Sequence, residues 1–223
     1  MDELPLFPLR TVLFPGMLMP INVFERRYLE MIAACQAEGR AFGVVLIKEG
    51  PEVGGPAVPH RVGTSAHVIR AERNEDNSGL TIVVVGRERF VIRDILQKRP
   101  YLVGAVERFP LEGVDDPRVG QLVRRVKDDL RAYMGLLGRV SGTVIQVEQL
   151  PDEPDILAWV IGIALQVSSL ERQELLECAD LPRLLGRELQ LLNLEQKLLQ
   201  FMARTEDDQE RWNTFPFTQR PPN

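Results

Sequence analysis

The chain has 223 residues, of which 44% are apolar and 26% are charged, and its formal net charge is −5. These values are typical of a water-soluble globular protein with enough length for a substantial core. An acidic balance argues against a nucleic-acid ligand, because phosphate binding needs a basic surface. The longest unbroken apolar run, Ile156–Leu165, has about half the length of a membrane span, so we expect no contact with a membrane.

The first half of the chain, from residue 4 to about residue 110, is predicted to be mainly β-structure. Its short apolar runs are broken by proline, which restricts such strands to the edges or bends of a curved sheet or barrel. Apolar residues at helical spacing predict one helix over Phe24–Glu38, and the prolines and glycines of Lys48–Pro59 predict a surface loop. The expected strands are Leu4–Leu9, Val12–Phe14, Met17–Val23, Phe42–Ile47, Val62–Arg73, Leu80–Arg87, Glu88–Leu96 and Tyr101–Phe109.

The second half of the chain, beyond Pro110, is predicted to be helical. The first helix of this half has an apolar face, and Ser168 and Glu171 have capping-box spacing at the start of the third helix. A fourth helix is rich in leucine, and a polar tail follows it. The expected helices run from Val119 to Leu137, from Pro154 to Leu165, over Leu170–Cys178, and from Asp180 to about Met202.

These elements predict an α+β protein with two subdomains. Residues 1–112 are expected to form the β-subdomain with its one inserted helix, and residues 113–204 the helical subdomain. Residues 205–223 are expected to be a flexible or docked tail. Its aromatic residues Trp212, Phe215 and Phe217 indicate either a segment that folds back on the body, which we favour, or a motif that binds a partner.

No catalytic, metal-binding or cofactor-binding motif is found in the sequence. None of the four lysines follows a glycine, so a phosphate-binding P-loop is absent from this chain. His60 and His67 are the only histidines, and no nucleophile elbow accompanies them. Cys35 and Cys178 have no metal or redox spacing, and they suit a reducing, cytoplasmic setting.

Several motifs in the right order resemble the N-terminal, substrate-binding domain of Lon proteases. The clearest are Leu4–Leu9, Leu13–Gly16 and Phe24–Tyr28, and further matches downstream include Gly86–Phe90. The resemblance extends from Leu4 to about Met202. It implies a PUA-like β-barrel with an inserted helix, followed by a C-terminal α-helical bundle. Two positions depart from the family pattern: Arg26 stands where proline is common, and Asn22 where histidine often occurs.

By this resemblance we expect a stand-alone, non-catalytic module that recognises unfolded or hydrophobic protein segments, together with a separate ATPase or protease as a further partner. The ATPase and the Ser-Lys peptidase of full-length Lon proteases are not expected here. The peptide-binding surface is expected in the groove between barrel and bundle. Apolar residues of the proline-broken strands are its candidates, since those left exposed would suit varied apolar side chains: Phe7, Phe14, Met17, Met19 and Phe24.

Two alternatives belong to other classes of function. PUA-like barrels include RNA binders, and Arg87, Arg89 and Arg93 are predicted to share one strand face that would contact RNA. Glu88 lies among them, and no stacking aromatic residues accompany them, which favours an ordinary solvated face. The other alternative is an adaptor that self-associates through its leucine-rich fourth helix.

Overall fold

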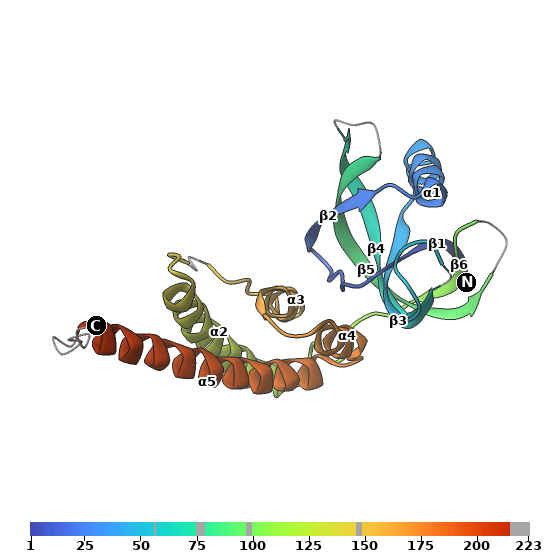
Figure 1. The fold of residues 1–223 in the computed structure, drawn as a ribbon. Helices are drawn as coiled ribbons and strands as arrows, with labels where there is room; N and C mark the ends of the chain where they lie inside the picture. The colour runs from blue at the N-terminus through green and yellow to red at the C-terminus, as the bar shows by residue number, and fades with distance from the viewer. Residues whose placement is uncertain (56, 75–78, 97–99, 146–148, 215–223) are drawn as a thin grey trace, which may run out of the picture.

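The computed structural model describes residues 1–55, 57–74, 79–96, 100–145 and 149–214, with side chains through residue 204. The first half of the chain forms a mixed β-sheet with one helix, and the second half forms a group of helices beside it (Figure 1). A mixed sheet plus helices is therefore confirmed. The PUA-like barrel, the helical bundle and the boundary at residue 112 stay predictions. None of the helices within these ranges is long and apolar enough to cross a membrane.

The sheet has the strand order β2-β5-β4-β3-β1-β6, and β6 also pairs with β5. β1 and β3 are parallel, whereas the other paired strands are antiparallel. Among the residues that the structure describes, β2 has a single neighbour, β5, so one of its edges is unpaired. The strands are β1 (Asp2–Leu9), β2 (Leu18–Val23), β3 (Phe42–Glu49), β4 (Val58–Arg73), β5 (Leu80–Ile95) and β6 (Val103–Arg108).

β5 is one continuous strand, which corrects the predicted break between Arg87 and Glu88. Its first part pairs with β2 and its second part with β6. Gly86 lies between the two parts, and a Cβ atom built there would stand 2.2 Å from the carbonyl oxygen of Phe14. A residue without a side chain is therefore needed where the strand passes this segment.

The loop before β4 is shorter than predicted. Val58 and Pro59 belong to β4, where Pro59 pairs with Ile47 of β3 across an irregular register. Pro59 lies near the start of its strand, one of the places in a sheet where the missing N–H is tolerated. The segment between the end of β3 at Glu49 and the start of β4 at Val58 contains the loop that the sequence predicts. Gly50 and Gly54 in this loop have positive φ angles, which glycine adopts easily.

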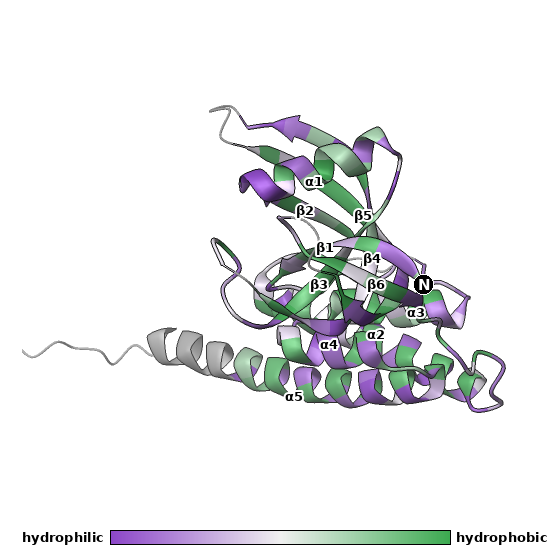
Figure 2. Cartoon of the chain, turned by 90° about the vertical axis from the view of Figure 1, so that its right-hand side faces the viewer, coloured by the Kyte–Doolittle hydropathy of each residue, from purple (hydrophilic) through white to green (hydrophobic). Residues whose placement is uncertain are grey.

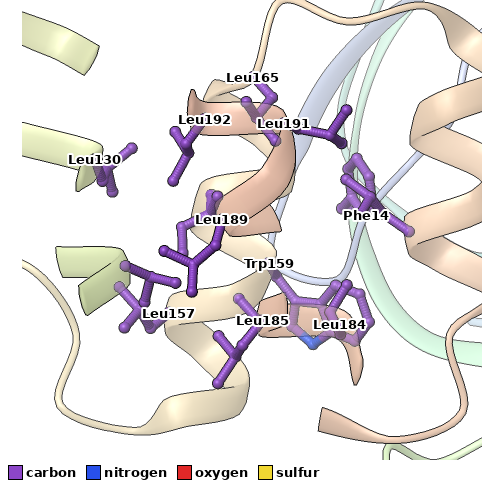
Figure 3. Close-up of a cluster of buried hydrophobic side chains, with 14 of the residues drawn as sticks. Phe14, Leu130, Leu157, Trp159, Leu165, Leu184, Leu185, Leu189, Leu191 and Leu192 are labelled. Atoms are coloured by element: carbon purple, nitrogen blue, oxygen red, sulfur yellow. The ribbon is translucent and has the colours of Figure 1, made fainter. Parts of the chain in front are cut away.

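The predicted strand Val12–Phe14 is wrong, because this segment is irregular and its apolar side chains are buried. The Phe14 ring is fully buried and stacks on Trp159, with 6.1 Å between ring centroids. It also covers Gly162, where an added Cβ atom would stand 3.1 Å from the ring. Figure 3 shows Phe14 beside the leucines of the helices. The apolar run therefore reflects contact with helices and not sheet pairing.

The helices largely follow the sequence signals. Ser168 and Glu171 form the predicted capping box at the start of Ser169–Glu177, the third helix of the second half of the chain. Gly39 has a φ angle of 62° just after the first helix, as expected of a left-handed C-cap. The last helix continues to Thr214, beyond the end predicted at about Met202. The helices are α1 (Arg26–Ala37), α2 (Val119–Ser141), α3 (Pro154–Ala164), α4 (Ser169–Glu177) and α5 (Leu181–Thr214).

The largest core cluster joins the sheet to the helices. α2 and α5 lie side by side in both views (Figures 1 and 2), and leucines from both helices pack around α3. Val12, Phe14, Leu46 and Val62 from the first half of the chain belong to this same cluster. The apolar side chains of both halves are thus buried together.

Glu188 of α5 lies within this helical region, is fully buried, and has no hydrogen-bond partner for either carboxylate oxygen among the described residues. Burial raises the pKa of its carboxyl well above the ordinary value. The folded state therefore favours the protonated form, and its stability falls as the pH rises from the unfolded pKa through the folded pKa.

We expect Glu188→Gln to remove this pH dependence. Denaturant unfolding of both proteins between about pH 5 and about pH 8 should show the variant gaining stability over the wild type as the pH rises, with a slope of at most about 1.4 kcal/mol per pH unit. Parallel pH profiles would show that Glu188 is not protonated by folding.

Candidate functional site

An open apolar pocket lies beside the unpaired edge of β2. Its volume is about 430 Å³, and it extends from β2 to β1, the start of α1 and the loop after β3. Met19, Ile21 and Val23 of β2 are buried, whereas Leu18, Pro20 and Asn22 are exposed. We call this space the β2 pocket; it is lined by Phe7, Leu9, Thr11, Met17, Met19–Val23, Phe24, Glu25, Tyr28, Glu52 and Val53.

The hydrogen-bonding direction of β2 follows from its pairing with β5. The Gly86 N–H donates to the Met17 carbonyl oxygen, so the Met17 carbonyl faces β5. Backbone groups alternate in direction along a strand. The N–H and C=O groups of Leu18 and Asn22 therefore face away from β5, together with the C=O of Pro20. These are the groups that a further strand would meet.

Four of the five predicted peptide-binding residues line the β2 pocket. Phe7 and Met19 are buried in its wall, Met17 is half-buried, and the Phe24 side chain is 53% exposed. The fifth, Phe14, is not part of the pocket, because it packs against α3. The sequence reasoning missed Leu18, which is 60% exposed at the open edge; the alternation of β2 was the signal that could have found it.

Polar contacts hold one wall of the pocket in place. The Glu25 carboxylate accepts a hydrogen bond from the Gly54 N–H at 3.2 Å and pairs with Arg27 at 2.9 Å. The Arg10 N–H donates to Glu52 at 3.0 Å. Burial raises the pKa of the Tyr28 hydroxyl above its ordinary value. Both carboxylates are already engaged, so the pocket is suited to apolar side chains.

The three arginines of the RNA alternative are not equivalent. Arg87 and Arg93 are exposed, whereas Arg89 is 4% exposed. Arg93 pairs with Glu107 at 2.7 Å. A guanidinium this buried is not displayed on the strand surface to an RNA backbone that passes over the sheet, so the predicted three-arginine face is wrong at Arg89. Helices cover the sheet at that point, and strand alternation alone carries no information about what covers a face.

Arg89 connects the sheet to the helices. Its Nη1 donates to the carbonyl oxygens of Leu176 at 2.7 Å and Cys178 at 2.6 Å, at the C-terminal end of α4. Its guanidinium carbon stands 4.6 Å from the Phe109 ring centroid and 4.9 Å from that of Trp159. Burial lowers the pKa of Arg89 to about 10, so the side chain stays charged at neutral pH.

The remaining polar candidates do not assemble into a reactive site. His60 Nδ1 lies 3.4 Å from Glu177 Oε1, and His67 is exposed on β4. Among the residues that the structure describes, no group of three His, Cys, Asp or Glu side chains is placed to hold a metal ion. Trp212 is in α5, but its side chain lies outside the described part of the chain, as do Phe215 and Phe217.

The sequence of this chain matches the family model described as "ATP-dependent protease La (LON) substrate-binding domain" over residues 3–194. The chain belongs to this LON family. It is 30% identical to the Lon protease of Anaeromyxobacter dehalogenans over 200 residues, covering 88% of this chain and 24% of that protein. It is 28% identical to Lon protease 2 of Sorangium cellulosum over 210 residues, covering 88% and 26%.

Solved structures of LON N-terminal domains have the same fold. The Lon N-terminal domain protein from Xanthomonas campestris is 29% identical, with a TM-score of 0.64 over 85% of this chain and 98% of that one. The N-terminal domain of Lon protease from Mycobacterium avium complex gives a TM-score of 0.68 at 23% identity, covering 86% and 98%. This LON-family chain spans about a quarter of the length of the curated relatives named above.

We expect Arg89→Met to lower the free energy of unfolding by about 3 kcal/mol, because two carbonyls at the end of α4 lose their donor in a buried setting. Denaturant unfolding measures this loss. Arg93→Met is the matched control, since Arg93 is an exposed arginine of the same strand, and its effect should stay within about 0.5 kcal/mol. Equal effects of the two substitutions would contradict the role given to Arg89.

Proposed function

We propose that this protein recognises segments of other proteins at the β2 pocket. The segment would lie extended along β2 and place an apolar side chain in the pocket. The observation that carries this proposal is the position of the pocket beside an unpaired strand edge, whose outward-facing groups belong to Leu18, Pro20 and Asn22. An extended chain supplies both backbone hydrogen bonds and alternate side chains to such an edge. Membership of the LON substrate-binding family supports this proposal.

The expected affinity is modest. Burial of one or two apolar side chains contributes about 2 kcal/mol each, before the cost of association and of ordering the segment. Binding of this strength selects chains that expose apolar residues in an extended state, as unfolded proteins do. A native globular protein buries such residues and would not compete.

We also infer a non-catalytic role, a PUA-like barrel and a helical bundle. The pairing of β6 with both β1 and β5 supports a barrel, and the packing of α2 and α5 around α3 supports a bundle. The bond of Glu112 N–H to Ala179 and the shared core indicate that the proposed subdomains, residues 1–112 and 113–204, would act as one unit. A separate ATPase or protease remains a proposed partner.

We expect Leu18→Ala combined with Phe24→Ala to weaken binding of a labelled, permanently unfolded model protein by about tenfold, since Leu18 is an exposed apolar residue of β2 and Phe24 an exposed apolar residue of the pocket lining. Fluorescence anisotropy measures the binding, with the native form of the same model protein as the negative control. Thermal unfolding should change little, because neither side chain is buried.

Ile69→Ala is the matched control for surface hydrophobicity, because Ile69 is 55% exposed on β4 and lies outside the pocket lining. Unchanged binding by the double variant, or an equal loss in the control, would overturn the proposal. Truncation of Met17 and Met19 is a poorer test, since Met19 is buried and its loss would destabilise the fold by about 2 kcal/mol.

A second candidate function, self-association through α5, is favoured by one observation. Leu194, Leu198, Phe201 and Met202 are exposed at helical spacing on this helix. Such a stripe is typical of a surface that packs on another helix.

We expect the molar mass from light scattering to rise with protein concentration if α5 mediates assembly. Leu194→Glu combined with Leu198→Glu should abolish this rise, because charges would be placed within an apolar contact. Leu170→Glu, on the exposed face of α4, is the control. A monomer at all concentrations would exclude this function.

A further inference from the structure

A second pocket lies between the sheet and α3, and it shares no lining residue with the β2 pocket. Its volume is about 590 Å³. Pro15 and Gly16 form part of its rim, next along the chain to Met17 of the β2 pocket. The other walls come from β5, the end of β6 with the segment after it, and one face of α3. We call it the α3 pocket.

Three arginines line the α3 pocket: Arg87, Arg89 and Arg108. Arg108 is paired with Glu88 at the rim. The Arg87 residue is exposed, and its side chain forms no hydrogen bond or ion pair with the described residues. Arg89 uses Nη1 for the two carbonyls of α4, whereas its buried Nη2 has no hydrogen-bond partner in the described part of the chain. A buried guanidinium donor without a partner costs free energy that an anion would recover.

The acidic groups of the pocket do not neutralise Arg87 or Arg89. Glu88 and Asp155 are the carboxylates among the lining residues. Glu88 is engaged with Arg108, and Asp155 lies in the first turn of α3, where the helix amides stabilise its charge. No carboxylate of the described residues pairs with Arg87 or Arg89. The pocket therefore has an excess of positive charge, although the chain as a whole is acidic.

The opposite wall is apolar and belongs to α3. Ile156, Trp159, Val160 and Ile163 lie at helical spacing along it, and Phe109 and Leu111 continue it from the segment after β6. Ile156 is 47% exposed although it begins an apolar run. The pocket thus presents an apolar surface and unpaired positive charge within one space.

We propose that the α3 pocket binds the C-terminal residue of a polypeptide that ends in an apolar side chain. The terminal residue carries its carboxylate and its side chain on the same carbon atom, which matches the closeness of the two surfaces. The carboxylate accepts hydrogen bonds from Arg87 and from Nη2 of Arg89, and the side chain packs on Ile156 and Trp159. This inference rests on the proposed function only in taking protein chains as ligands, since the site is a different one.

The test uses three short labelled peptides of one sequence and fluorescence anisotropy. The first ends in leucine with a free carboxylate, the second ends in the same leucine as an amide, and the third is amidated but carries glutamate before the leucine. We expect the free acid to bind at least about tenfold more tightly than either amide, because charge-assisted hydrogen bonds are lost in the amides. The difference should shrink as salt is added.

Substitutions of Arg87 and Ile156 test whether the peptide binds in this pocket. Both residues are exposed, so their replacement should not disturb the fold. Arg87→Ala should reduce the affinity for the free-acid peptide to that for the amidated peptide. Ile156→Ala should reduce the affinity for the free-acid peptide at least about fivefold. Arg93→Ala is the control, because Arg93 is on the same strand, pairs with Glu107 and does not line the pocket.

Several results would overturn the inference. These are equal binding of acid and amide, binding of the glutamate peptide as tight as that of the acid, no binding of any peptide, or full binding by Arg87→Ala. The proposed function is judged separately, because the unfolded model protein can be prepared with an amidated C-terminus and tested against the Leu18 and Phe24 substitutions. Either site can therefore fail while the other holds.

Discussion

The burial of one charged side chain, Arg89, is the constraint on which the arrangement of sheet and helices depends. Its charge is removed from water and stabilised by the carbonyls that end α4 and by two aromatic faces. Arg89 thus connects β5 to the segment after β6, to α3 and to the C-terminal end of α4. A shift of any one of them would leave the guanidinium without compensation, and such a loss is strongly destabilising in a buried setting. The contacts of Arg89 therefore determine where the helices lie on the sheet.

Packing around Phe14 provides the apolar counterpart of this constraint. The ring occupies the space left by Gly162 and stacks on Trp159, the residue that also covers Arg89. Gly86 leaves room for the backbone of the same segment. The chain from Pro15 to Met17 then separates the two pockets, one of which lies along β2 and the other along α3. The turn at Pro15 and Gly16 and the residue after it, Met17, thus contribute to the walls of both pockets.

Local signals predicted much of the fold and a part of the site. Apolar periodicity located α1 and α2, and the Ser168–Glu171 capping box located the start of α4, because each depends on neighbours in sequence. The burial of Phe14 and Arg89 depends on α3 and α4, which are distant in sequence, so no local pattern shows it. The alternation along β2 is a local signal that marks Leu18 as exposed, whereas the position of β2 at the edge of the sheet depends on pairing between distant segments, which no local pattern shows.

Pro20 has a consequence for the behaviour of this protein at high concentration. It lies on the unpaired edge of β2 at an outward-facing position, where it offers a carbonyl but no N–H. An exposed strand edge is a template on which further copies of a protein aggregate, and proline is one means of preventing this. If copies of this protein paired through their β2 edges, the backbone N–H donor in the middle of the strand would be missing at Pro20. The same residue leaves the two ends of the strand able to pair, so it discourages fibrous growth and is compatible with the proposed binding of one short segment.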